Sequence, residues 1–165
     1  MADESRNENF QKLTELMQDA RICMLTTMTS DGKHVSRPMG LQEAEFDGNL
    51  WFFTKTDSNK VGQIQVNSDV NVAFSDQKHN AWVSISGNAE IVQDKAKMEE
   101  LWNPLLKAWF PDELETPGIT LLKVNAQSAE YWDSPGGAVV SLFGMVKAAV
   151  TGKPAEGGEN KSIDL

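Results

Sequence analysis

Hydroxyl and cationic side chains gather at the end of an aromatic segment in the first half of the chain. The segment WFFTKTDSNK, residues 51–60, places Thr54, Ser58 and Lys60 just after three aromatic residues. Ser58 is a residue type that begins helices, and apolar residues at helical spacing follow it. A helix N-terminus offers free backbone N–H groups and a partial positive charge. This combination predicts an anion-binding site suited to a phosphate.

A predicted β-hairpin adds an arginine to these groups. Three extended segments between residues 22 and 54 are separated by Asp31-Gly32 and Asp47-Gly48, two sequences typical of hairpin turns. They predict a three-stranded antiparallel meander. With a two-residue turn at Asp47-Gly48, Arg37 lies opposite Ser58. The arginine then converges with the other polar groups.

Apolar side chains are expected beside the predicted phosphate site. Met39, Phe52 and Phe53 can form a wall for a flat ring, so the residues indicate a phosphorylated aromatic cofactor. In the alternative interpretation, Ser58 only caps the helix, and Arg37 and Lys60 are solvated surface charges.

The remaining segments predict a small antiparallel β-barrel with flanking helices. A capping-box pattern begins an amphipathic helix over residues 5–20. Apolar and polar residues alternate within 70–75 and 83–91, and 118–132 reads as a long strand bulged near Asn125. Together with the meander these segments make six strands. We expect one domain over 1–133 and a Gly-rich, partly disordered tail over 134–165.

Two shorter helical segments are predicted between the last two strands. Asp94 is a candidate N-cap for the first, and Pro104 and Pro111 bracket the second. Trp109 and Phe110 are assigned to core or dimer contacts.

Composition narrows the class of protein. The net charge is −9, which argues against nonspecific nucleic-acid binding or an anionic membrane surface. The sequence contains neither a bilayer-spanning apolar run nor a signal peptide. The single cysteine, Cys23, is expected to be buried and inert and fits a reducing cytoplasm. The two histidines, His34 and His79, are expected at the surface, so no metal site is predicted.

Four segments, taken in order, resemble one known family. They are SRPMG (36–40), FFTKTDSNKV (52–61), VSISGNAEIV (83–92) and AEYW (129–132). This set resembles the general stress protein branch of the pyridoxamine 5'-phosphate oxidase-like superfamily. The resemblance implies a six-stranded split β-barrel. It also implies a homodimer that binds FMN, or alternatively FAD, at the subunit interface.

The resemblance assigns roles to residues of the first half of the chain. Arg37 matches the strand arginine that holds the FMN phosphate. Pro38 and Met39 match residues that lie along the isoalloxazine ring. Phe53 and Thr54 match the pair at the ring and the ribityl chain.

Further matches, and two departures, lie in the helix and the later strands. Ser58, Asn59 and Lys60 match a Ser-Arg-Lys phosphate grip, in which Asn59 replaces a cation. Trp82 stands where the oxidases have a cofactor-contacting Gln. Trp132 matches a Trp that reaches the flavin from the second subunit. The resemblance also gives an alternative place for Trp109 and Phe110, lining the flavin cleft.

The segment after Trp132 departs from the oxidases. An Arg-x-His motif binds their substrate, whereas DSPGG stands here, so we expect no pyridoxine-phosphate oxidation and assign no catalytic residue. A flavin-binding stress protein is the first interpretation. The alternative is an oxidoreductase whose FMN passes electrons from NAD(P)H to a small acceptor. A third is a split barrel that holds haem or a deazaflavin.

Overall fold

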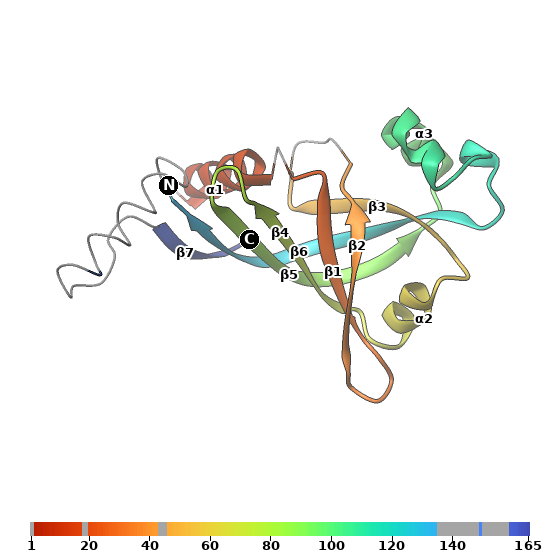
Figure 1. Cartoon of the computed structure of the whole chain (residues 1–165), viewed down its shortest axis with the longest axis horizontal. Coiled ribbons are helices and arrows are strands. Elements are labelled where there is room, and N and C mark those ends of the chain that lie inside the picture. Colours follow the sequence, from red (N-terminus) through yellow and green to blue (C-terminus); the bar gives the residue numbers. More distant parts are fainter. Residues whose placement is uncertain (1, 18–19, 43–45, 135–148, 150–158) are drawn as a thin grey trace.

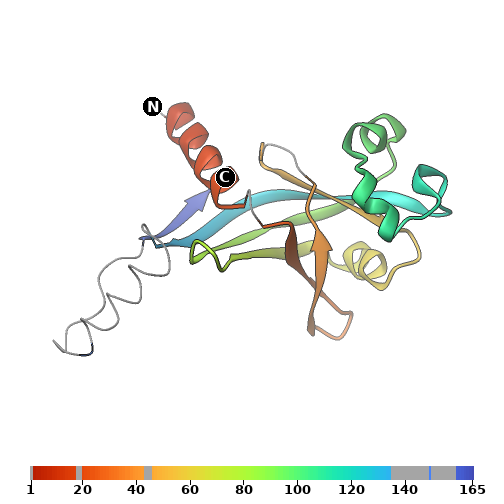
Figure 2. The same cartoon turned by 45° about the horizontal axis from the view of Figure 1, so that its top comes forward.

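The computed structural model is mainly β, with helices at both ends of a long, twisted sheet (Figures 1 and 2). It describes residues 2–17, 20–42, 46–134, 149 and 159–165. The elements in chain order are α1 (Ala2–Met17), β1 (Ile22–Met28), β2 (His34–Gly40), β3 (Asn49–Lys55), α2 (Asn59–Val66), β4 (Asp69–Asp76), β5 (Ala81–Val92), α3 (Lys95–Leu101), two short 3₁₀ helices, η1 (Pro104–Ala108) and η2 (Glu113–Glu115), β6 (Ile119–Asp133) and β7 (Glu159–Asp164).

The strands form one antiparallel sheet in the order β2-β1-β4-β5-β6-β3, with β7 also paired to β6. Strands β2 and β3 are therefore the two ends of this path. Within the described residues neither pairs with the other, so the barrel is split between them. Helix α1 lies near one end of the sheet, whereas α2 and α3 lie near the other, on the side of β2 and β3 (Figure 1).

Alternating apolar residues place one face of the sheet in the core. The predicted alternation is confirmed in β4, where Val70, Val72 and Phe74 are buried, and in β5, where Val83 and Ile85 are buried. The predicted Asp94 cap is also found: the Asp94 carboxylate accepts a hydrogen bond from the Lys97 backbone N–H at the start of α3.

The predicted pairing of the second and third extended segments is wrong. Strand β2 pairs with β1, so Arg37 lies opposite Leu25 and not Ser58, while β3 pairs with β6. Pairing with β6 sets Phe52 beside Leu122, and both are fully buried. Strand β2 contains Pro38, which has no N–H to donate and therefore suits an edge strand.

Two predicted boundaries also need correction. The first helix begins at Ala2 and ends at Met17, so the predicted capping box lies inside it; acidic residues ahead of Ser5 favour the earlier start.

At the C-terminus, Glu159–Asp164 forms β7, a seventh strand that lies in the predicted tail. Ile163 of β7 packs in the core. The rest of that tail, 135–148 and 150–158, lies outside the described residues.

None of the helices in the described part of the chain is long and apolar enough to span a membrane.

The predicted bulge in the long strand lies two residues beyond Asn125. The pairing of β5 with β6 shifts between Ser86 and Gly87, which leaves Gln127 as the additional residue. Gly87 allows the close approach of strands at this point, because a Cβ there would lie 2.1 Å from the Asn125 carbonyl oxygen.

We predict that Gly87→Ala lowers the free energy of unfolding, because backbone atoms must move to admit the methyl group; overpacking of this kind costs about 1–3 kcal/mol. Gly62→Ala is the matched control: its Cβ meets nothing within 4 Å inside α2, and alanine should stabilise the helix by about 0.5–1 kcal/mol. Urea denaturation measures both. Equal stability of the two variants would contradict the close approach.

Candidate functional site

A cleft of about 330 Å³ lies where the edge strands β2 and β3 meet the start of α2. It lies at the split of the barrel, where neither strand pairs with another strand of the described residues on that side. Six of the ten residues predicted for the ligand site line it: Pro38, Met39, Phe53, Thr54, Ser58 and Lys60. The described lining also includes Gly40, Lys55, Asp57, Leu106, Trp109 and Phe110.

Arg37 lies beside this cleft and anchors helix α2 to the sheet. Its Nη1 donates hydrogen bonds to Thr27 Oγ1 at 2.7 Å and to the Leu25 carbonyl oxygen at 3.3 Å, and its Nη2 donates to Gln63 Oε1 at 3.0 Å. A guanidinium has five N–H donors, so these bonds leave two for a ligand. The interpretation of Arg37 as a solvated surface charge is wrong, because the side chain is partly buried and well bonded.

Lys60 brings a second cation to the same place. Its side chain is partly buried, and burial lowers the pKa of Lys60, with the positive charge of Arg37 lowering it further. Burial also lowers the pKa of Arg37. Within the described residues no carboxylate pairs with the Lys60 ammonium; Asp57 lines the cleft without an ion pair to it. Two like charges held together in this way favour an anion between them.

Ser58 is placed for binding as well as for capping. It is the N-cap of α2, as predicted, yet its hydroxyl makes no capping hydrogen bond. Instead Ser58 Oγ lies 3.2 Å from Thr54 Oγ1, and both residues line the cleft. The first N–H groups of a helix have no carbonyl partner within it. The start of α2 therefore adds backbone donors to two hydroxyls and two cations.

The other side of the cleft is apolar. Phe53 packs edge-on against Trp102, with ring centroids 5.6 Å apart, and against Phe110 at 6.3 Å. Met39 is buried in the same wall. The prediction that Phe52 belongs to this wall is wrong: successive side chains of a strand point to opposite faces, and Phe52 lies in the main core.

Besides Arg37, three predicted site residues do not line the cleft. Asn59 is exposed at the first position of α2. Trp82 and Trp132 lie directly opposite each other on β5 and β6, and they are 40% and 38% exposed. Their roles stay predictions.

Sequence reasoning missed two side chains that hold the arginine. Thr27 Oγ1 and Gln63 Oε1 are themselves 2.6 Å apart, so both join the Arg37 cluster. Gln63 lies three residues after Lys60 in α2, which puts both on one helix face; this spacing is the signal that could have identified it. Trp109 and Phe110 line the cleft, which supports the alternative given for them.

The remaining candidate reactive groups lie elsewhere. Cys23 is buried as expected, and burial raises the pKa of its thiol to about 12, so it stays protonated near neutral pH. His34 and His79 are both exposed, and His79 pairs with Asp76 at 2.6 Å. The described residues contain no cluster of His, Cys, Asp and Glu that could hold a metal ion.

Comparison with known proteins is consistent across sequence and structure. A family model described as "pyridoxamine 5'-phosphate oxidase like" matches residues 8–156. Among curated proteins, the chain is 31% identical to protein bli-3 of Neurospora crassa over 159 residues, which cover 90% of this chain and 76% of bli-3.

Solved structures share the same architecture. A general stress FMN/FAD-binding protein from Xanthomonas citri is 31% identical, with a TM-score of 0.66 over 77% of this chain and 89% of that one. A candidate general stress protein 26 from Jannaschia sp. CCS1 is 23% identical, with a TM-score of 0.76 over the full length of both chains. At 23% identity, the likeness to the Jannaschia protein concerns the fold alone. That fold is a mainly β antiparallel split barrel with flanking helices.

The Arg37 cluster predicts a stability effect in α2. Gln63→Leu removes the acceptor of Arg37 Nη2, and leaving a charged donor short of a partner should cost about 1–3 kcal/mol in the free energy of unfolding. Gln65→Leu is the matched control because Gln65 is exposed on the same helix. Thermal or urea unfolding of both variants provides the test. Indistinguishable variants would show that Gln63 does not hold the arginine.

Proposed function

The chain belongs to the pyridoxamine 5'-phosphate oxidase-like family, and on that premise we propose that its cleft binds the phosphate of FMN, as a flavin-binding stress protein. The observation that carries the proposal is the pair of cations, Arg37 and Lys60. The charge of Arg37 is close enough to lower the pKa of Lys60, which lies in the first turn of α2, and no described carboxylate pairs with Lys60. A phosphate dianion would remove their repulsion and accept their hydrogen bonds.

The residues of the cleft fit the rest of such a cofactor. Thr54 and Ser58 offer hydroxyls where a polyol chain would follow the phosphate, and Met39, Phe53 and Phe110 offer an apolar wall for a flat ring. FAD shares the phosphate, the polyol chain and the ring, so it is the second candidate ligand. The Xanthomonas citri relative is described as binding either flavin.

Binding, without an assigned reaction, is the function that the cleft supports best. A bound flavin would supply reversible redox chemistry, which the protein tunes and orients. Among the described lining residues, Lys55, Lys60 and Asp57 are the titratable groups, so the cleft shows no histidine or cysteine to act beside the ring. Transfer of electrons from NAD(P)H to a small acceptor stays the alternative function.

We predict that Arg37→Ala and Lys60→Ala each weaken FMN binding. A hydrogen bond to a charged group contributes about 1.5–3 kcal/mol, which is roughly a 10- to 150-fold rise in Kd. Lys78→Ala removes the same charge from an exposed loop and should leave Kd unchanged. Fluorescence titration of FMN measures all three variants. If both site variants bind FMN as tightly as the parent, the phosphate assignment is wrong.

A homodimer is the second part of the proposal. Trp82 and Trp132 are side by side and well exposed on the outer face of the sheet, and Ile22 and Met24 are exposed on β1. A second copy of the chain would cover this apolar face. The resemblance to the family further suggests that Trp132 of one copy reaches the flavin of the other. The chain would act in the cytoplasm, with no nucleic-acid or membrane partner.

The exposed tryptophans predict how the dimer can be broken. Replacing both Trp82 and Trp132 with Ser should turn a dimer at micromolar concentration into a monomer, because the buried indole area is lost. Val66→Ser is the control: Val66 is also exposed, but it lies on α2. Sedimentation velocity distinguishes the species. A monomeric parent with FMN bound, or a double variant that sediments as a dimer, would contradict the proposal.

A further inference from the structure

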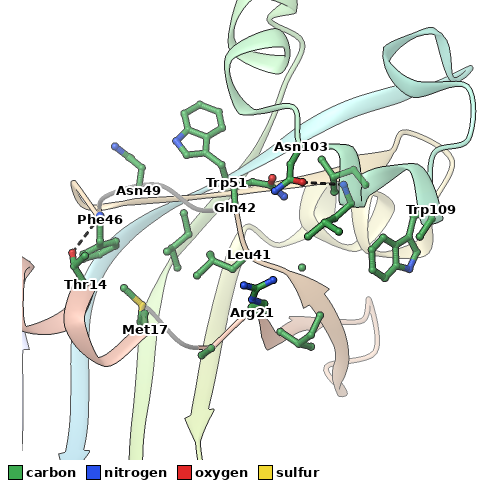
Figure 3. A pocket seen from close by; sticks show the side chains of 17 residues that line it. Thr14, Met17, Arg21, Leu41, Gln42, Phe46, Asn49, Trp51, Asn103 and Trp109 are labelled. Atoms are coloured by element: carbon green, nitrogen blue, oxygen red, sulfur yellow. Dashed lines mark hydrogen bonds between the residues drawn. The ribbon is translucent and has the colours of Figure 1, made fainter.

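A larger cavity, of about 960 Å³, adjoins the cleft in which we propose that FMN binds. Phosphate binding in the cleft does not require this cavity. It lies between the end of α1, the start of β1, the end of β2, the start of β3 and η1 (Figure 3). Gly40, Leu106 and Trp109 belong to both linings. A molecule in this cavity would therefore be a neighbour of the ligand in the cleft.

The walls of the cavity are mainly apolar and partly aromatic. Met17, Phe46 and Leu50 are buried in the main core and form its inner side. Two indoles, Trp51 and Trp109, also line it, and Trp109 is 62% exposed. Aromatic side chains favour a flat partner with which they can stack or meet edge to face.

The polar groups of the lining differ in whether they already have partners. Thr14 Oγ1 donates to the Phe10 carbonyl oxygen and accepts from the Phe46 N–H. Asn103 Oδ1 accepts from the Leu105 N–H at 2.9 Å. Arg21 also interacts with other groups of the chain. These contacts hold the walls of the cavity in place.

Gln42 is different. The residue is 7% exposed, and across the described residues no hydrogen bond involves its side-chain amide. In Figure 3 that side chain lies between those of Trp51 and Trp109. Among the described residues, no side-chain nitrogen or oxygen that is shielded from solvent lacks a partner. The Gln42 amide is therefore still reached by solvent, and a ligand group in the cavity can form a hydrogen bond with it.

We infer that this cavity binds a neutral ring compound of the quinone class, with a ring carbonyl accepting a hydrogen bond from the Gln42 amide. The apolar walls and the indoles favour a flat, uncharged ring. The neutral Gln42 amide favours a carbonyl over a charged group, and Arg21, the only charged residue of the described lining, already has an interaction. The inference stands whether or not FMN fills the neighbouring cleft.

Duroquinone is a suitable probe, because its four ring carbons other than the carbonyl carbons all carry methyl groups, which hinder the addition of thiols to the ring. Calorimetric titration into the full-length protein, with and without saturating FMN, should show binding in both cases. Durene, the same methylated ring without carbonyls, should bind more weakly. Failure of FMN to bind would leave the duroquinone result intact, so the two proposals fail separately.

Two substitutions test the assigned site. Gln42→Leu should weaken duroquinone binding roughly 3- to 10-fold, the effect of one hydrogen bond, and should remove its advantage over durene. Leu105→Lys puts a charge on an exposed lining residue and should also weaken binding, whereas Val66→Lys, exposed on α2 away from the cavity, should not. Absence of duroquinone binding, or equal binding by the parent and both cavity variants, would overturn the inference.

Discussion

The repulsion between Arg37 and Lys60 is the constraint on which the rest of the site depends. Folding brings both cations together in a partly buried place, where water screens them less than at the surface. Three hydrogen bonds hold the arginine to Thr27, Leu25 and Gln63. An acidic protein with a net charge of −9 thus keeps a local cationic site, and a bound phosphate would balance it.

The split of the barrel makes this site possible. Because β2 and β3 are the two ends of the strand order, their facing edges leave room for a ligand between them. Helix α2 follows β3 directly, and Ser58 and Lys60 at its start line the same opening. The cationic cluster, the hydroxyl pair and the aromatic wall come from different elements, and the Arg37 hydrogen bonds join β1, β2 and α2.

Local patterns predicted the strands better than their partners. Alternation in β4 and β5, the Asp94 cap and the Ser58 cap follow from neighbouring residues and were found as expected. The pairing of β3 with β6 depends on burying Phe52 against Leu122, a contact between distant parts of the chain that no turn signal reveals. Strand β7 was missed because ENKSID is mostly polar and Ile163 is its one buried residue; the strand is held mainly by pairing with β6, which lies far from it in the sequence. The prediction nevertheless placed Arg37 and Lys60 near each other, as the structure does, because both residues lie at the edge of the split.

The most direct test of this account is a crystal structure of the protein grown with FMN. The account predicts the phosphate within hydrogen-bonding distance of the Arg37 guanidinium and the Lys60 ammonium, with the ring against Met39 and Phe53. A phosphate bound elsewhere, or an FMN-loaded protein in which these two cations point apart into solvent, would contradict it.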